Sequence, residues 1–238
     1  MKLDILAIGA HPDDIELSCG GTLVKHARTG KKVGLLDLTL GELGTRGTSV
    51  IRTTEAMESS RLIGAAVREQ LDMKDGLFEA TEENLRSIAV MIRKFQPEII
   101  LCNSVSDRHP DHGRAATMVS RAIFLAGLSK FPTALEEKEQ EAWKTKTTYH
   151  YIQDRYLIPD FVVDVTTEWD TKMKSILAYR SQFFDPNSPE PETPISSREF
   201  LEFLDGRARE MGRSAGFKYA EGFTVERTPG IDSLFNMR

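Results

Sequence analysis

The sequence predicts an α/β fold, a Rossmann-like, doubly wound and mostly parallel sheet with helices on both faces. Short apolar runs alternate along the chain with amphipathic segments of helical period. The runs at 3–8, 33–39 and 98–102 have the near-continuous apolar character of strands buried on both faces. At 238 residues the chain fits one large domain, which we assign to residues 1–238.

Helices are expected between these strands. Gly20-Gly21 opens the first one, which turns Leu23 and Val24 inward and ends at Gly30 as a C-terminal cap. Further helices are indicated by apolar residues on one face and by terminating Gly or Pro residues, at 52–63, 81–95 and 112–125.

The C-terminal half has a looser pattern. It predicts strands at 149–152 and 161–165 and a helix at 167–183. Residues 185–194 contain too many prolines for a helix or a central strand, so we expect a surface loop, with a substrate lid or a subunit contact as alternatives. Ser196 to Glu199 matches the S-x-x-E capping box and begins a final helix.

Composition narrows the class of protein. Hydrophobic residues make up 40% of the chain and charged residues 28%, which is ordinary for a globular protein. The net charge of −5 argues against a general nucleic-acid surface. The N-terminal run resembles neither a signal peptide nor a membrane span, so we expect a cytoplasmic enzyme without a membrane partner. Cys19 and Cys102 are expected to be small core residues.

Two short motifs concentrate side chains that can bind metal. Residues 9–14 read Gly-Ala-His-Pro-Asp-Asp at the end of the first strand, and residues 109–112 read His-Pro-Asp-His after the strand at 98–102. Zinc takes imidazole nitrogen and carboxylate oxygen, and a catalytic site uses three protein ligands and one open position. Because ligands of a doubly wound sheet lie at the carboxyl ends of its strands, the motifs can meet in space.

Helix capping is another interpretation of each motif, since Asp is a common N-cap and Pro is common in the first helical turn. Capping does not explain why three of the five histidines fall in these two runs. The pair of motifs therefore favours a functional site. Each Pro also biases the preceding His toward extended backbone. His26 and His150 lie outside the motifs, and each is expected to be a surface or a structurally satisfied histidine.

The AHPDD run at 10–14 and the HPDH run at 109–112 resemble the signatures of the LmbE-like, or PIG-L, zinc-dependent N-deacetylases. That family removes acetyl from N-acetylglucosamine conjugates. Weaker similarity covers most of the chain, at 39–47, at Arg52 with Glu55, at 75–76 and at 219–223.

The resemblance implies a role for each motif residue. His11, Asp14 and His112 would hold Zn²⁺, although the same ligands accept Fe²⁺, cobalt or manganese. Asp13 would be the general base. His109 would help to stabilise the tetrahedral oxyanion.

Substrate-binding residues are implied around this site. Glu42 and Arg46, in the glycine-rich loop after the second strand, are interpreted as a substrate wall, although a simple turn would explain the glycines. Arg52 is expected near the substrate, with an ion pair to Glu55 as the alternative. Asp75 is expected to accept sugar hydroxyls.

Arg108 and Asp111 complete the predicted site. Some relatives carry an aromatic residue just upstream of the second motif, where this chain has Asp107-Arg108. A guanidinium there suits an anionic aglycone, because it pairs bidentately with carboxylates. Asp111 has two open interpretations: it fixes the tautomer of a metal-binding imidazole, or it interacts with the helix dipole as a first-turn acid.

The leading functional prediction is zinc-dependent hydrolysis of the acetamide of N-acetylglucosaminyl-malate, as in bacillithiol biosynthesis. One alternative keeps the chemistry and changes the substrate to a chitin-derived oligosaccharide or an antibiotic precursor. Another is a non-catalytic Rossmann-like nucleotide-binding module, although the first loop lacks G-x-G-x-x-G. The expected partner is a small molecule, and the resemblance implies a homo-oligomer, for which a hexamer is our expectation.

Overall fold

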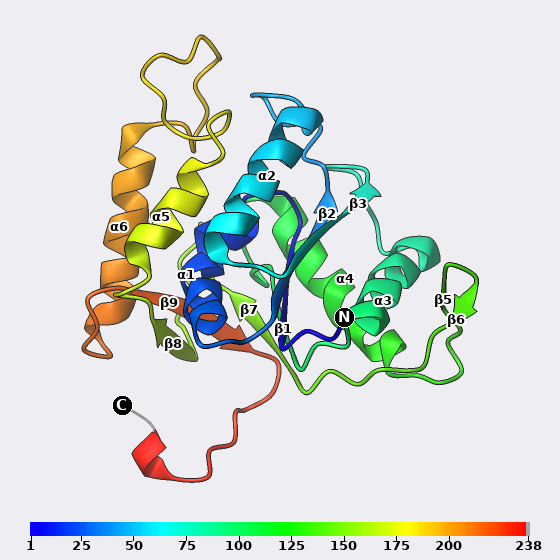
Figure 1. Cartoon of the computed structure of the whole chain (residues 1–238). Coiled ribbons are helices and arrows are strands. Elements are labelled where there is room, and N and C mark those ends of the chain that lie inside the picture. Colours follow the sequence, from blue (N-terminus) through cyan, green and yellow to red (C-terminus); the bar gives the residue numbers. More distant parts are fainter. Residues whose placement is uncertain (237–238) are drawn as a thin grey trace.

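A computed structural model describes residues 1–236 and shows a central sheet with helices packed on both sides (Figure 1). The sheet contains β1 (Ile5–Gly9), β2 (Val33–Thr39), β3 (Val67–Met73), β4 (Ile99–Cys102), β7 (Thr147–Tyr151), β8 (Phe161–Asp164) and β9 (Ala220–Val225). The strand order is β3-β2-β1-β4-β7-β9-β8. The first five strands in this order are parallel, and β9 pairs antiparallel with β7 and β8. The predicted mostly parallel α/β fold is confirmed.

The helices connect these strands, and a small hairpin lies apart from the sheet. The helices are α1 (Asp14–Arg28), α2 (Ser49–Ile63), α3 (Glu82–Phe95), α4 (Pro110–Ala126), α5 (Trp169–Leu177) and α6 (Arg198–Arg213). The hairpin pairs β5 (Ala134–Leu135) with β6 (Lys138–Glu139), and a 3₁₀ turn follows at Leu234–Asn236. None of the helices in the described part of the chain has the length and apolar character needed to cross a membrane.

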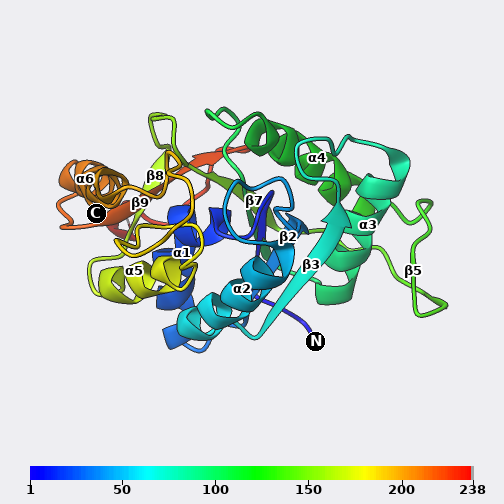
Figure 2. The same cartoon turned by 90° about the horizontal axis from the view of Figure 1, so that it is seen from above.

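Alternate residues of the central strands serve two cores. In β1, Leu6 and Ile8 belong to a cluster with residues of α3 and α4, whereas Ile5 and Ala7 pack with α1. This alternation follows from the two-residue period of a strand. Seen from above, α3 and α4 lie on one side of the sheet and α1, α2 and α5 on the other (Figure 2). The two predicted core cysteines are free and buried, one in each cluster.

The first helix begins earlier than predicted. It starts at Asp14, so Gly20 and Gly21 lie within α1 and do not open it. A Cβ atom on Gly21 would lie 2.8 Å from Cβ of Val165. Gly21 therefore reflects close packing of the helix and not a helix start, which the sequence pattern alone does not distinguish.

Two C-terminal boundaries also differ from prediction. The last helix begins after Ser197, whose hydroxyl accepts a hydrogen bond from the backbone of Phe200 at 3.1 Å. Ser196 instead belongs to the preceding loop, where its Oγ accepts from the backbone N–H of Thr193. The predicted helix at 167–183 is shorter and spans only α5. Residues 185–194 form a loop, as predicted.

The sheet topology places both sequence motifs at one edge. β1 pairs in parallel with β4, with Ala7 opposite Leu101. The chain leaves each of these strands at the same end of the sheet and enters α1 or α4. Because neighbouring parallel strands end together, residues 11–14 and 109–112 come into contact.

Candidate metal centre and active site

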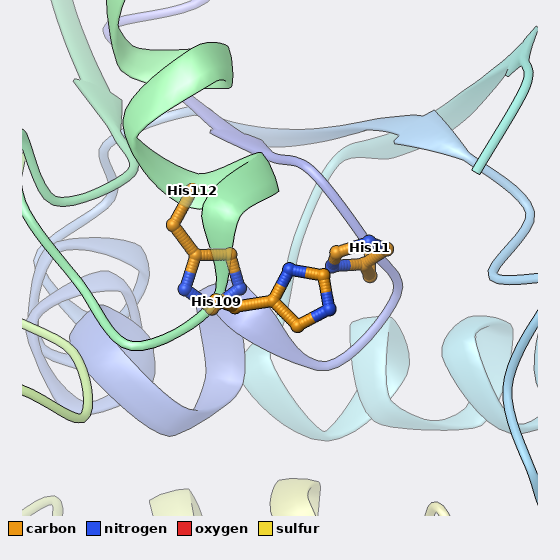
Figure 3. A group of neighbouring side chains, drawn as sticks. All are labelled: His11, His109 and His112. Atoms are coloured by element: carbon orange, nitrogen blue, oxygen red, sulfur yellow. The ribbon is translucent and has the colours of Figure 1, made fainter. Parts of the chain in front are cut away.

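The imidazoles of the two motifs gather where the loop after β1 meets the start of α4 (Figure 3). Ring centroids are 4.8 Å apart for His11 and His109, and 5.0 Å apart for His109 and His112. Asp14 lies between the outer two rings. Its Oδ1 is 3.0 Å from Nε2 of His112, and its Oδ2 is 3.6 Å from Nδ1 of His11.

The opposite ring nitrogens of these two histidines face other carboxylates. Nε2 of His11 lies 2.9 Å from Oδ1 of Asp75 and 3.3 Å from Oδ2 of Asp111. Nδ1 of His112 is hydrogen-bonded to Asp107. When these nitrogens donate, the lone pairs of His11 Nδ1 and His112 Nε2 point toward Asp14, the arrangement by which carboxylates orient metal-binding imidazoles.

Two amide side chains hold Asp14 in place. Nδ2 of Asn103 and Nε2 of Gln153 each donate to its carboxylate at 3.0 Å. Burial opposes ionisation of Asp14, but the facing imidazoles of His112 and His11 hold its pKa well below the usual range. Neither amide was predicted from sequence. The available signal was their position directly after β4 and just after β7, at the same edge of the sheet as the motifs.

The donor set fits a divalent cation. Burial lowers the pKa of His112, but the carboxylates of Asp14 and Asp107 outweigh it and raise that pKa to about 9. Two imidazole nitrogens and a carboxylate therefore face one another. The raised pKa of His112 means that this position favours a positive charge, and these groups are ligand types that zinc uses. Among the described residues, the two groups of His or carboxylate side chains whose ligand atoms all lie within 4.8 Å of one another both include His11. They are the three motif histidines, and His11 with Asp75 and Asp111.

Asp13 differs sharply from its neighbour Asp14. Its backbone is left-handed, with φ 111°, a conformation that costs a non-glycine residue of order 1–3 kcal/mol. Burial raises the pKa of its carboxyl to about 7, although the guanidinium of Arg52 opposes that shift. Strain and a perturbed pKa at one residue are features of functional sites.

Arg52 fixes the loop that carries Asp13. Its Nη2 donates to Oδ2 of Asp13 at 2.9 Å and to the carbonyl of Pro12 at 2.6 Å, and its Nη1 donates to the carbonyl of Gly41 at 3.2 Å. A Cβ on Gly41 would lie 2.1 Å from Nη1, so glycine is needed there. The alternative of an ion pair with Glu55 is wrong, because Glu55 accepts hydrogen bonds from Ser181.

His109 has the extended backbone that the following proline predicted, with φ −80° and ψ 124°. Burial and the neighbouring imidazoles of His11 and His112 lower its pKa, so the ring is neutral near pH 7. Its Nδ1 accepts a hydrogen bond from the backbone N–H of Asp111 at 3.3 Å. That bond places the ring proton on Nε2, which leaves His109 a neutral donor in the cavity.

A cavity of about 420 Å³ opens beside these residues. That volume lies in the range of about 300–1,000 Å³ typical of small-molecule sites. Eight of the predicted site residues line it: His11, Asp13, Asp14, Arg52, Asp75, Arg108, His109 and His112.

Comparison with known proteins identifies the family. A profile of the PIG-L family, described as GlcNAc-PI de-N-acetylase, matches residues 6–123. The structure of a conserved protein from Thermus thermophilus is 33% identical in sequence, covers 98% of each chain and superposes with a TM-score of 0.85. The chain belongs to the PIG-L family. Membership in this enzyme family replaces the nucleotide-binding alternative considered above.

Relatives of this PIG-L protein have been assigned more than one reaction. The diacetylchitobiose deacetylase of Thermococcus kodakarensis is 28% identical over 95% of this chain and 84% of its own. The 4-oxalmesaconate hydratase of Pseudomonas putida is 26% identical over 74% of this chain and 73% of its own.

Three predicted substrate residues of the PIG-L protein have other contacts. Glu42 accepts from the backbone N–H of Asp75 at 2.7 Å, and Arg46 donates to Ser188 at 2.5 Å; neither lines the cavity among the described residues. Both oxygens of Asp75 are occupied, one by His11 and the other by the backbone N–H of Leu43 at 3.1 Å. Asp75 therefore contacts an imidazole and also lines the cavity, so its predicted contact with sugar hydroxyls stays a prediction.

Asp111 and Arg108 also gain specific partners. Asp111 is fully buried and contacts His11, as the first of its two interpretations requires, and it accepts from Arg114 at 2.6 Å. Arg108 lines the cavity, but its Nε pairs with Oδ2 of Asp154 at 2.5 Å. Asp154 was not predicted, and it neutralises the charge that was expected to attract an anionic aglycone.

Proposed function

We propose that this PIG-L protein is a metal-dependent N-deacetylase that hydrolyses the acetamide of an N-acetylglucosamine conjugate, releasing acetate and the free amine. The observation that carries the proposal is Asp13: a buried carboxyl with a pKa of about 7 that lines the cavity beside the His/Asp cluster. The family description and the similarity to a diacetylchitobiose deacetylase support the substrate class.

His11, Asp14 and His112 are the proposed metal ligands. They present two imidazole nitrogens and one carboxylate, while Asp75, Asp111 and Asp107 occupy the outer nitrogens of the rings. A divalent ion held there supplies Lewis acidity toward the acetyl carbonyl. Zn²⁺ is the proposed ion.

Asp13 is proposed to move the proton. It accepts a proton from the water whose oxygen attacks the acetyl carbon, and it returns that proton to the sugar nitrogen as the C–N bond breaks. A pKa of about 7 suits both transfers, because the group is neither too weak a base nor too weak an acid near neutral pH. Arg52 keeps the carboxylate aimed into the cavity through its 2.9 Å contact.

His109 is proposed to stabilise the negative charge that develops on the carbonyl oxygen. Its Nδ1 is engaged by the backbone N–H of Asp111, so its Nε2–H is free to donate. A neutral donor suits this role because its proton stays on the ring throughout the reaction.

The candidate substrates differ in charge. N-acetylglucosaminyl-malate was predicted because of Arg108, and its carboxylates would share that guanidinium with Asp154, which already pairs with its Nε. An uncharged N-acetyl sugar conjugate needs no such sharing, and we propose it as the better fit. The similarity to a diacetylchitobiose deacetylase supports the same choice.

A substrate panel tests the proposal. The metal-loaded protein should release acetate from N-acetylglucosamine or its neutral glycosides, with kcat/KM at least equal to that on the malate conjugate. Arg108→Ala should leave acetate release from N-acetylglucosamine itself unaffected, because the monosaccharide has no group that reaches this side chain. Acetate release from the malate conjugate alone would restore the anionic assignment. Hydration of 4-oxalmesaconate without any acetate release would replace the deacetylase with the reaction of the Pseudomonas relative.

A further inference from the structure

One wall of the cavity is apolar and comes from elements outside the two motifs. Leu17 of α1, Ile195 before α6, and Phe200, Phe203 and Leu204 of α6 line this side. The polar groups of the metal centre lie in the same cavity. We refer to these five residues as the apolar wall.

Most of the wall is held rigid by the core behind it. Leu204 is buried in a cluster of α2, α5 and α6, against which Leu17, Ile195 and Phe200 pack. Phe203 is different, because it stands outside that cluster and keeps 40% of its surface exposed. Its ring is therefore available to a ligand in the cavity.

Arg207 ties Phe203 to the active site. Its guanidinium lies 5.2 Å from the centre of the Phe203 ring and donates to the carbonyl of Gln153, the residue whose amide holds Asp14. The same side chain donates to the carbonyl of Leu17 at 3.4 Å. The ring is thus fixed relative to the reacting end of the cavity and does not have to be ordered on binding.

We propose that Phe203 and the apolar wall form a subsite for the aglycone of the substrate. This subsite takes an uncharged pyranose ring linked to the acetamido sugar. The subsite rests on the proposed deacetylase function. A pyranose presents C–H groups on its face and hydroxyls at its edge. Phe203 packs against the face, and Thr193 and the Arg108–Asp154 pair, which line the same cavity, hydrogen-bond the edge.

The charges around the wall favour a neutral occupant. Arg108 is paired with Asp154, and Arg52 is paired with Asp13. Arg207 is engaged by two carbonyls and by the Phe203 ring. A dianionic group would leave apolar surface uncovered and would have to share guanidinium groups that are already paired, whereas a second sugar ring covers the wall and keeps these pairs.

Binding and activity together test the subsite. By calorimetry, the wild type should bind the mono-deacetylated disaccharide, in which glucosamine is linked to an uncharged N-acetylglucosamine ring, more tightly than glucosamine. Phe203→Ala should weaken binding of this disaccharide and lower kcat/KM on N,N′-diacetylchitobiose by roughly 3- to 10-fold, with N-acetylglucosamine unaffected. Phe203→Leu, which keeps an apolar side chain, guards against misfolding and should show a smaller loss in the same direction.

Phe124→Ala is the matched control, since Phe124 is 68% exposed near the end of α4 opposite to the site. It should change neither measurement. Equal losses on the monosaccharide and the disaccharide, or equal affinity of the wild type for glucosamine and the mono-deacetylated disaccharide, would overturn the subsite. A wild type that binds this disaccharide through Phe203 yet releases no acetate from any N-acetyl sugar would refute the deacetylase function alone.

Discussion

Nε2 of His112 lies 3.0 Å from Oδ1 of Asp14, although one residue lies in the first turn of α4 and the other begins α1. The contact joins the two sequence motifs through their ligand atoms. Asp14 also faces the second imidazole of the proposed metal centre, His11, so that each oxygen of its carboxylate faces one ring.

Metal content should depend on both motifs. We expect about one divalent ion per chain in the wild type, and loss of most of it in His112→Ala and in Asp14→Ala, because each change removes a ligand. Elemental analysis of protein purified without added metal measures this. His26→Ala, on the same helix as Asp14, should keep its metal. Full occupancy in His112→Ala would rule out the proposed ligands.

Asp107 should tune the metal affinity without binding the ion. Asp107→Asn weakens the charge that orients His112, so the dissociation constant for Zn²⁺ should rise about 10- to 100-fold. Competition with a chelating dye gives that constant. Asp154→Asn, which removes a nearby carboxylate paired with Arg108, is the control and should leave it unchanged. Equal affinities for wild type and Asp107→Asn would reassign Asp107 to a purely structural role.

Asp13 and Asp14 should separate into different functions. Asp13→Asn should keep the metal and lose kcat by at least about 100-fold, as expected when a general base is removed. Metal analysis and acetate release on the same preparation distinguish the two effects. If Asp13→Asn turns over at the wild-type rate, another group takes the proton.

Arg68 should be essential for stability. Its side chain is fully buried and pairs with Glu16 at 2.6 Å and Asp37 at 2.7 Å. Arg68→Met would leave two buried carboxylates without a cation, which should cost about 3–5 kcal/mol in the free energy of unfolding. Urea titration measures the change. Arg61→Ala removes an exposed pair with Glu58 and should stay within about 0.5 kcal/mol of the wild type.

His150 should make stability depend on alkaline pH. Burial lowers its pKa, but hydrogen bonds to Cys102 and Glu226 outweigh this and bring it to about 10. Between about pH 6.5 and that value the native state keeps a proton that the unfolded state has lost. The stabilisation from His150 is therefore complete below pH 6.5 and should fall as pH rises.

Urea unfolding between pH 6.5 and 9 measures this slope, and an NMR titration of the His150 ring gives its pKa directly. Glu226→Gln removes the negative partner 3.0 Å from Nε2, so it should lower the pKa and flatten the slope. A His150 ring that titrates near 6.5 in the wild type would contradict the expectation.

Sequence pattern predicted the helix ends that depend only on neighbouring residues. Gly64 ends α2 with a positive φ, as the terminating glycine in the sequence indicates, and α3 lies at Glu82–Phe95, where a helix at 81–95 was predicted. Strand β3 was missed, because its residues are mostly half-buried and include Arg68, Glu69 and Asp72. From sequence, an arginine is expected at the surface. The burial of Arg68 follows only from its ion pairs with Glu16 and Asp37, which the sequence does not show.

The site likewise contains residues that the sequence predicted and residues that only the structure revealed. The motif residues were recognised because Pro and Asp follow His at fixed short spacing. Asn103, Gln153 and Asp154 could not be found by spacing, since each gains its role only from the order of β4 and β7 in the sheet. Glu42 shows the converse, because a charged residue in a matching loop accepts a hydrogen bond from the backbone of Asp75, a contact that the sequence did not indicate.

The pairing of β1 with β4 makes the proposed metal centre a product of tertiary folding. Neither motif holds enough ligands by itself, and the unfolded chain keeps them far apart. An ion that binds the native state and not the unfolded one adds its binding free energy to that of folding. The thermal midpoint should therefore rise with the concentration of free metal and fall when a chelator removes the ion.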